Sequence, residues 1–276
     1  MIVSFYRYGR LGNRLFTFAN LISFSESHNV PLLMPAFSEY SAGFPFFRNN
    51  SACAYGFRQP KPPGYPTAVM AAAGARVRVI PTVRFWEGRY VYFDGEDAGD
   101  QRVQTMITAP AVIFEGWDFC SRRAILQFRE RIRSVFSPRT EIMEHAARFR
   151  AQLLERGDVV VGVHVRWGDY RGTERFFDLP DYLQRMDEIR DLLFPSTPVF
   201  AVFSPEAIPA DALPADGCVC SSGVLEDLYS LAECDYIVGP PSTFSMWASY
   251  YGGHPLFVMK KGARFLQKSM AAIATP

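Results

Sequence analysis

The sequence lacks the signatures of several common functional classes. It contains no G-x-x-x-x-G-K-S/T loop, which argues against a P-loop nucleotidase, and no G-x-S-x-G turn of the α/β-hydrolase type. No histidine-rich spacing indicates a metal site. No apolar run reaches the roughly 18 residues that a membrane-spanning helix needs. The sequence thus gives no indication of a P-loop nucleotidase, an α/β-hydrolase, a histidine-based metal site or a membrane-spanning helix.

The chain also has little net charge and few cysteines. A net charge of +1 over 276 residues gives no general attraction to nucleic acid or to an anionic membrane, so any anion site must be local. Of five cysteines only Cys218 and Cys220 lie close together, which is not a zinc spacing, and we expect all five to be reduced. The first residues read as a strand rather than a signal peptide. These features predict a cytoplasmic protein with at most peripheral contact with the inner membrane.

Strands and helices alternate along both halves of the chain, which predicts an α/β fold with parallel sheets and right-handed connections. Gly157-Asp158 interrupts the pattern just before a strand that starts at Val159. The predicted domains are therefore 1–155 and 156–276, with a last helix that could pack back on the first domain. The architecture we expect is two Rossmann-like, doubly wound domains that face a cleft.

Within the first half, helices are expected over residues 13–27 and 121–136, because apolar residues recur there at helical spacing. Residues 40–66 are rich in proline, glycine and aromatics without a clear period, and predict a long irregular insertion. Aromatics form 15% of the chain. Those in the insertion and in FWEGRYVYF (residues 85–93) are explained equally well by core packing and by a sugar-binding surface.

A buried strand leads directly into a cluster of charges in the segment Val159–Glu174, VVVGVHVRWGDYRGTE. The continuous valine run is typical of a parallel strand buried on both faces. Ligands of open parallel sheets bind beyond the carboxyl ends of the strands. Arg166 follows such an end and could bind a phosphate or carboxylate through two hydrogen bonds, and Asp169 could orient the Arg166 side chain. Simple pairing between these ions is the alternative. His164, taken alone, is as well explained as a core residue.

A second anion-binding pattern occupies residues 240–253, PPSTFSMWASYYGG, again directly after a strand. Ser242 and Thr243 are good N-cap residues, and a helix is expected over 244–251. Free amides at a helix start carry partial positive charge and bind phosphate, and the hydroxyl of Ser245 would add a donor. A diphosphate could bridge these two strand ends, although an ordinary capped helix explains the second stretch by itself.

Four stretches, in this order along the chain, resemble motifs of the alpha-1,2-fucosyltransferases and of the wider superfamily with the alpha-1,6- and protein O-fucosyltransferases. GRLGNRLFTFAN resembles their G-G-L-G-N-Q-x-F-Q-Y-A, FEGWDFC their G-Y-x-Q-S stretch and GVHVRWGDY their H-x-R-R-G-D-Y signature. LEDLYSLAECDYIVGPPSTFSMWASYYGG resembles D-x-x-x-L-x-x-C followed by S-T-F-S-x-W-A-A and G-G. The resemblance implies a GT-B fold and inverting transfer of fucose from GDP-fucose to a glycan acceptor in polysaccharide biosynthesis. It also implies metal independence, with which the lack of any Asp-x-Asp pair agrees.

The same resemblance implies roles for individual residues, and neither a cofactor nor a metal ligand is among them. Arg166 matches the arginine that holds the β-phosphate. The other residues of the implied donor-binding set fall into three groups. The guanosine contacts are His164 and Asp227, and the serine motif around the diphosphate is Ser242, Thr243, Phe244 and Ser245. Gly12 and Asn13 of the first domain lie on the sugar side. The catalytic set is Arg166, Glu174 and Asp169. Glu174 stands where the alpha-1,6 enzymes carry the glutamate proposed as general base, and Asp169 is the rival for that role.

Three positions depart from the motifs and keep two further interpretations open. Trp167 replaces the second arginine of the signature, and Arg10 and Arg14 replace a glycine and a glutamine of the first motif. These changes would suit a transferase for another nucleotide sugar. They would also suit a nucleotide-sugar-binding module without catalysis.

Overall fold

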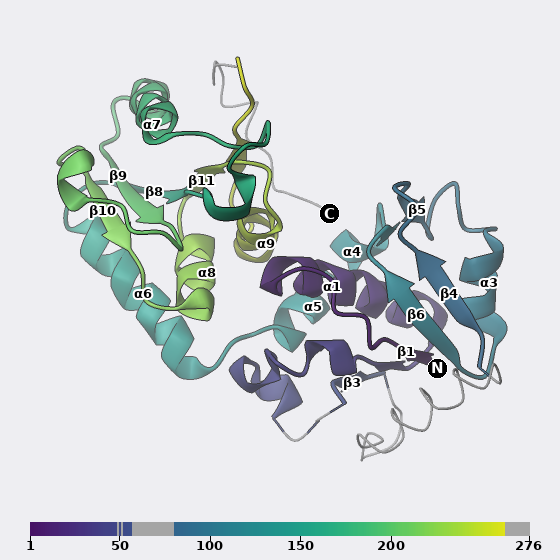
Figure 1. The fold of residues 1–276 in the computed structure, drawn as a ribbon. Coiled ribbons are helices and arrows are strands. Elements are labelled where there is room, and N and C mark those ends of the chain that lie inside the picture. The colour runs from purple at the N-terminus through teal and green to yellow at the C-terminus, as the bar shows by residue number, and fades with distance from the viewer. Residues whose placement is uncertain (49, 51, 57–79, 263–276) are drawn as a thin grey trace. The chain divides into compact units, whose positions relative to one another are not determined.

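The structure is a computed structural model that describes residues 1–48, 50, 52–56 and 80–262 (Figure 1). The chain divides into two compact units, Met1–Arg139 and Thr140–Thr275. The predicted boundary after residue 155 differs from this division by one helix. Helix α6 (Thr140–Leu154) belongs to the second unit because it packs along α8 (Val224–Ala232) of that unit.

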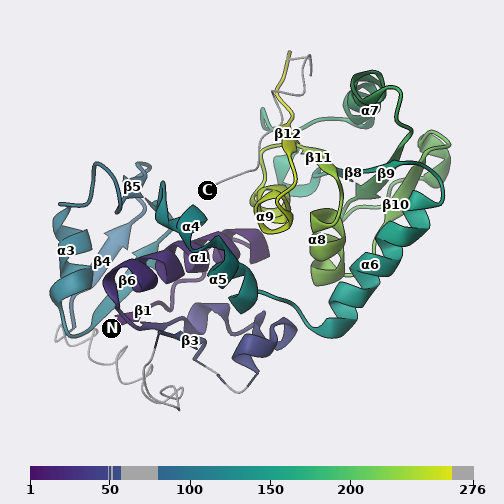
Figure 2. The same cartoon turned by 180° about the vertical axis from the view of Figure 1, so that it is seen from behind.

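A mostly parallel sheet with the strand order β3-β2-β1-β6-β4 forms the centre of the first unit. The chain runs from β1 towards β2 on one side and later returns to place β6 on the other side, so the strand order reverses between β1 and β6. Helix α1 lies beside α4 and α5 in the two opposite views (Figure 1 and Figure 2). The elements of this unit are β1 (Ile2–Val3), α1 (Leu11–His28), β2 (Leu32–Leu33), η1 (Pro35–Phe37), η2 (Ser41–Gly43), η3 (Pro45–Phe47), β3 (Ala54–Tyr55), β4 (Thr82–Phe85), β5 (Val91–Tyr92), α3 (Gln101–Thr108), β6 (Val112–Gly116), β7 (Phe119–Cys120), α4 (Ala124–Gln127) and α5 (Arg129–Val135).

Phenylalanines fill the core of the first unit. Phe18, Phe37, Phe47 and Phe136 are buried and contact one another with ring centroids 5.4–6.2 Å apart. Residues 41–47 of the predicted irregular insertion therefore form short 3-10 turns that carry core aromatics. The part of the insertion from residue 57 onward lies outside the described residues.

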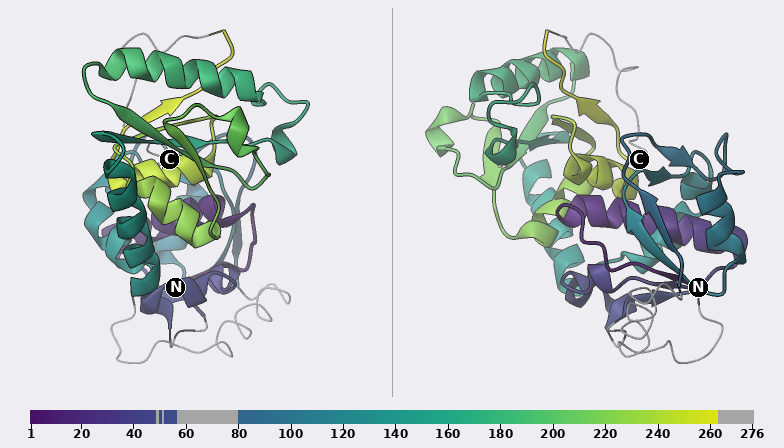
Figure 3. Two further views of the ribbon diagram at one scale, coloured as in Figure 1. Left: turned by 90° about the vertical axis from the view of Figure 1, so that its left-hand side faces the viewer. Right: turned by 45° about the vertical axis from the view of Figure 1, so that its right-hand side comes forward.

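The second unit contains a five-stranded, fully parallel sheet with the order β10-β9-β8-β11-β12. Helix α7 covers one face, and α6, α8 and α9 cover the other (Figure 3). The strand order reverses between β8 and β11, as it does in doubly wound nucleotide-binding sheets. The elements are α6, β8 (Val159–His164), η4 (Gly168–Tyr170), α7 (Leu179–Leu193), β9 (Pro198–Phe203), η5 (Ala210–Ala212), β10 (Gly217–Cys220), α8, β11 (Tyr236–Gly239), α9 (Thr243–Gly252) and β12 (Leu256–Val258).

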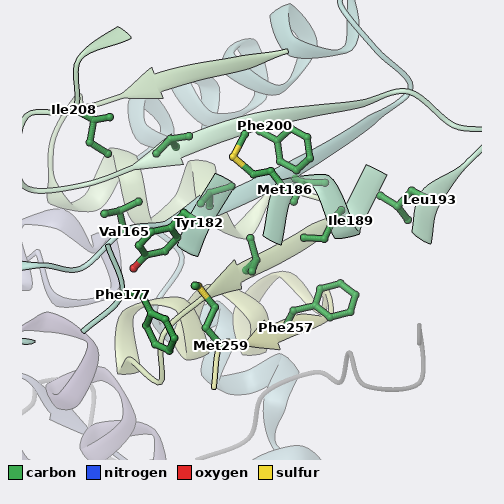
Figure 4. Close-up of a cluster of buried hydrophobic side chains, with 14 residues drawn as sticks. Val165, Phe177, Tyr182, Met186, Ile189, Leu193, Phe200, Ile208, Phe257 and Met259 are labelled. Atoms are coloured by element: carbon green, nitrogen blue, oxygen red, sulfur yellow. The ribbon is translucent and has the colours of Figure 1, made fainter. Parts of the chain in front are cut away.

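Alternate residues of β8 point to opposite faces of this sheet. Val161 and Val163 pack with Met186 and Ile189 of α7 in one buried cluster, part of which Figure 4 shows. On the other face Gly162 allows α8 to approach, because a Cβ atom there would lie 2.4 Å from a methyl carbon of Leu231. The periodicity of β8 thus directs His164 towards the face covered by α8 and α9.

The remaining elements follow the predicted pattern with two differences in the first unit. The helix expected over 121–136 is divided into α4 and α5 at Phe128, where φ is −98° and ψ is 16°. Strands β3, β4 and β7 and helix α3 were not predicted. The expected C-terminal helix lies outside the described residues. None of the helices within the described ranges combines the length and apolar character that a membrane span needs.

The start of α4 is held by a carboxylate from a distant loop. Asp94 accepts hydrogen bonds from the backbone amides of Arg122, Arg123 and Ala124 and from the hydroxyl of Ser121, at 2.6–2.9 Å. Partial burial raises the pKa of Asp94, but these hydrogen bonds outweigh it and bring the pKa to about 2. Asp94 therefore satisfies amides that would otherwise lack partners at this helix start.

We predict that Asp94→Ala lowers the free energy of unfolding by about 1–2 kcal/mol, the usual effect of losing a helix cap. Because the folded pKa lies below the usual value of 3.8, the contribution of Asp94 is present above pH 4 and is lost as the pH falls towards 2. Urea unfolding at pH 7 and at pH 3 measures both effects. Glu96→Gln, which alters an exposed ion pair with Arg122, should leave the midpoint unchanged, and an equal loss in both variants would contradict the capping role.

Candidate functional site

The carboxyl ends of β8 and β11 lie side by side at the point where the strand order of the second unit reverses. Val163 pairs with Val238, so His164 and Gly239 are neighbours across the two strands. The approach requires a glycine, because a Cβ atom at Gly239 would lie 2.9 Å from the carbonyl oxygen of His164. The loops that follow these two strands therefore begin next to each other.

Arg166, two residues after the end of β8, is held by a two-pronged ion pair. Its Nε and Nη2 atoms donate to the two carboxylate oxygens of Asp169, each at 3.0 Å. The guanidinium also lies over the ring of Tyr170, 5.3 Å from the centroid. The Arg166 side chain is 17% exposed, and within the described residues Nη1 makes no hydrogen bond. One edge of the guanidinium is thus fixed while the other can bind an anion.

Tyr170 connects this loop to the one that follows β11. Its hydroxyl donates to the carbonyl oxygen of Pro241 at 2.8 Å, and Pro241 directly precedes the N-cap of α9. On the strand side, the ring of His164 lies 5.1 Å from the ring of Phe244 in the first turn of that helix. The two predicted anion-binding stretches are therefore in contact within one unit.

The first turn of α9 offers amides more than hydroxyls. Ser242 is the N-cap, and its side chain accepts from the amide of Phe244 at 3.3 Å. The hydroxyl of Ser245 is fully buried and donates to the carbonyl oxygen of Ser242 at 3.1 Å. In this arrangement the Ser245 hydroxyl is engaged within the first turn of the helix. Among the described residues the amides of Thr243 and Ser245 have no hydrogen-bond partner, and Thr243 itself is partly exposed.

His164 is buried to 3% exposure beneath the site. Burial, with a smaller contribution from the charge of Arg166, lowers its pKa to about 3. Its Nδ1 atom is buried and has no hydrogen-bond partner among the described residues. The histidine is thus a neutral group that retains an unused polar atom.

Two further contacts fix the backbone of the loop after β8. The indole Nε1 of Trp167 donates to the carbonyl oxygen of Phe177 at 2.9 Å, and its ring packs against the cluster beneath α7. Glu206, which follows β9, accepts from the amide of Gly168 at 2.8 Å. Trp167 is therefore an anchor of the loop, which explains how a tryptophan can stand where the motif has an arginine.

For two of the predicted residues in this unit, Asp227 and Glu174, no hydrogen bond or ion pair to Arg166 is found within the described residues. Asp227 lies in the first turn of α8 after β10, where it accepts from the amide of Ser222 at 2.9 Å and where burial raises its pKa. Because β9 separates β10 from β8, the end of β10 lies two strand spacings, about 10 Å, from the end of β8, and Asp227 lies in the helix that follows β10. Glu174 is exposed, and the described residues include no hydrogen-bond partner for it.

The first unit holds Gly12 and Asn13 in the first turn of α1. The Asn13 side chain packs beneath Gly9, where φ is +60° and a Cβ atom would lie 1.9 Å from Nδ2 of Asn13. Arg14 donates to the carbonyl oxygens of Ala36 and Gly9 and pairs with Glu39 at 2.8 Å. Arg14, one of the two arginines that depart from the first motif, thus connects α1 to residues 9, 36 and 39 of this unit.

The sequence did not identify Tyr170 or Glu206 as site residues. Tyr170 is the last letter of the G-D-Y stretch, but its role depends on Pro241, which lies 71 positions away. Glu206 bonds across 38 positions. No local spacing could have revealed either contact. The described residues include no group of three or more histidine, cysteine, aspartate or glutamate side chains that could hold a metal ion.

No protein-family model matches the chain, and no curated protein matches it in sequence. Solved structures do match. A variant of Arabidopsis thaliana FUT1 in complex with GDP has a TM-score of 0.59 at 14% identity, covering 99% of this chain and 74% of that one. The fucosyltransferase NodZ from Bradyrhizobium has a TM-score of 0.57 at 16% identity and 96% of both chains. POFUT1 in complex with GDP-fucose has 0.56 at 12%, covering 92% and 94%. These similarities confirm the predicted α/β, GT-B-like fold with two Rossmann-like units.

We predict that His164 does not titrate between pH 8 and pH 4.5. Its neutral form is favoured by burial beside Arg166, so protonation should begin only towards pH 3. Imidazole carbon and nitrogen shifts followed by NMR through this range would test the expectation. His145, for comparison, lies on α6 and provides an internal reference signal. A His164 midpoint near 6.5 would contradict the buried geometry.

Proposed function

We propose that the protein is an inverting, metal-independent glycosyltransferase that transfers fucose from GDP-fucose to a sugar hydroxyl of a surface glycan. The single observation that carries this proposal is the contact between the Arg166 loop and the start of α9 through Tyr170. This contact places a guanidinium and a set of free amides at the point of strand reversal, where doubly wound sheets bind nucleotides. The motif resemblance and the fucosyltransferase structures with GDP or GDP-fucose support the choice of donor.

The charge of the site suits a diphosphate. The free edge of Arg166 offers guanidinium N–H donors, with a charge that Asp169 partly balances, and the start of α9 adds about half a positive charge and the amide of the partly exposed Thr243. Both groups are fixed in advance, by Asp169 and by the N-cap Ser242. Fixed cationic groups of this kind can neutralise a diphosphate without a cation, so transfer should continue in the presence of a chelator.

The nucleoside would extend along the sheet edge towards β10. His164 offers its unused Nδ1 atom at the end of β8, and Asp227 provides a carboxylate two strands away. A separation of about 10 Å along the edge is comparable to the span from a phosphate to the far side of a purine base. This direction agrees with guanosine contacts at both residues.

Transfer would proceed by direct displacement at the anomeric carbon. The acceptor oxygen forms its bond to that carbon while the bond to the β-phosphate oxygen breaks, and the bonding electrons leave with GDP. Negative charge therefore grows on the diphosphate, where Arg166 and the α9 amides stabilise it electrostatically. Gly12 and Asn13 of the first unit are assigned to the sugar side of the donor by the motif resemblance alone.

The proton of the acceptor hydroxyl must be taken by a base, and Glu174 is the better candidate. Both oxygens of Asp169 accept from Arg166, so protonation of Asp169 would weaken the fork that grips the donor. Glu174 lies five residues further along the same loop and is exposed. We therefore assign Asp169 to orienting Arg166 and Glu174 to general-base catalysis.

Two alternative functions arise because Trp167, which anchors the loop, stands where the signature motif has a second arginine. A transferase for another nucleotide sugar would use the same diphosphate grip, since Arg166 and α9 do not read the sugar. A binding module without catalysis would bind GDP-fucose and neither hydrolyse nor transfer it. Calorimetry with GDP, GDP-fucose, GDP-mannose and UDP-sugars, followed by hydrolysis assays, separates the three.

We predict that Arg166→Ala lowers the transfer rate from GDP-fucose by about 10²–10³-fold, the scale of losing one charge-stabilising donor. Arg166→Lys should recover only part of the rate, because an ammonium cannot make the forked contact with Asp169. Steady-state transfer and GDP calorimetry provide the readouts. Arg148→Gln, an exposed arginine on α6 that pairs with Glu144, controls for loss of surface charge. Near-normal transfer by the alanine variant would remove Arg166 from the mechanism.

We predict that Glu174→Gln lowers kcat by about 10²–10⁴-fold and leaves the affinity for GDP unchanged, because a base acts on the acceptor and not on the donor. Asp169→Asn, in contrast, should weaken GDP binding as well as turnover. Unaltered turnover in Glu174→Gln with normal GDP binding would exclude this residue as the base.

A further inference from the structure

Four tyrosine and tryptophan side chains form a connected surface cluster in the first unit. Tyr8 stacks on Trp117 with ring centroids 4.0 Å apart and planes at 15°. Tyr6 lies 6.1 Å from Trp117 and 5.2 Å from Trp86, and the two tryptophans are 6.4 Å apart. We call this set the aromatic platform. All four side chains are partly exposed.

The platform lies where the strand order of the first sheet reverses. Tyr6 and Tyr8 follow β1, Trp117 follows β6, and Trp86 follows β4, while β1, β6 and β4 are neighbours in the sheet. The carboxyl edge at such a reversal is the usual ligand position of doubly wound sheets. In the second unit the same position holds the charged groups around Arg166, whereas here it holds aromatic rings.

The backbone beneath the platform is tightly fixed. Gly116 takes a φ of +134°, and a Cβ atom there would lie 2.2 Å from the carbonyl oxygen of Phe85. That oxygen accepts from the amides of both Trp117 and Asp118 at 2.9 Å. The buried carboxylate of Asp118 in turn accepts from the amide of Gly88, which holds the loop carrying Trp86. The rings are therefore held in place before any ligand arrives, which lowers the entropic cost of binding.

Core packing does not account for these residues. The fully buried aromatics of the unit are mostly phenylalanines, whereas the platform contains only tyrosine and tryptophan. Trp247 is fully buried, and Trp167 donates its indole proton to Phe177. The hydroxyls of Tyr6 and Tyr8 and the indole nitrogens of Trp86 and Trp117 have no hydrogen-bond partner among the described residues, yet none is a buried unpaired atom. They face solvent and can donate to a ligand.

A pyranose ring is the ligand whose chemistry matches both properties. A gluco- or galacto-configured ring has a face of C–H bonds that packs on an aromatic plane, and hydroxyls around its rim that accept from phenol and indole donors. A phosphate has no such face, and a purely aliphatic ligand would leave the four donors unused. We therefore propose that the aromatic platform binds a neutral pyranose of an oligosaccharide. Resting on the proposed function, this oligosaccharide is the acceptor.

Saturation-transfer NMR with cellotetraose, N-acetylchitotetraose and β-1,4-galactotetraose tests the proposal. At least one of the three should bind the wild-type protein, with saturation strongest on sugar ring C–H protons. Trp86→Ala and Tyr8→Ala should each weaken that binding at least about tenfold, as expected on removing an aromatic anchor. Sorbitol carries similar hydroxyls without a ring face and should not bind.

Phe46→Ala provides the matched control, because Phe46 is an exposed aromatic of the same unit and lies outside the platform. It should retain full binding. Failure of all three oligosaccharides to bind, or equal binding by the wild type and by Trp86→Ala and Tyr8→Ala, would overturn the platform. Calorimetry with GDP on the same proteins keeps the two proposals apart. If Trp86→Ala and Tyr8→Ala lose sugar binding but keep normal GDP affinity, the platform proposal is supported. If the wild type does not bind GDP, the proposed transferase function is contradicted.

Discussion

The register between β8 and β11 is the constraint on which the candidate site depends. With Val163 opposite Val238, both strands end at the same level, and Gly239 permits the contact with His164. A shift of one residue would turn His164 and Arg166 to the other face of the sheet. Tyr170 then joins the two loops through one hydrogen bond to Pro241. The site is thus determined by strand pairing first and by side-chain chemistry second.

Much of this site could be predicted because its signals are local. The valine run that ends in charged residues predicts β8. The second strand, followed by N-cap residues, predicts β11 and the start of α9. Contacts between distant positions could not be read in this way, as Tyr170, Glu206 and the buried hydroxyl of Ser245 show. The division between the two units lies one helix before the predicted boundary for a similar reason: helix α6 precedes the break at Gly157, but it packs on α8.

The two units place different chemistry at equivalent positions of similar sheets. In the second unit the reversal point carries a guanidinium, free amides and a neutral buried histidine. In the first it carries four aromatic rings above a fixed backbone. Composition alone could not distinguish these surfaces, because aromatics are abundant throughout the chain and many of them are core phenylalanines. The distinction emerged only from which rings have exposed polar atoms.

Asp94 gives the first unit a resident counter-anion. The amides at the start of α4 would attract phosphate if they were vacant, but the chain fills them with its own carboxylate, which stays ionised at any ordinary pH. A nucleotide therefore finds no free amide at the residues that Asp94 occupies, 122–124. The chain thus helps to determine where a polyanion can bind. Asp94 already occupies the amides at the start of α4, whereas no carboxylate of the described residues caps the start of α9.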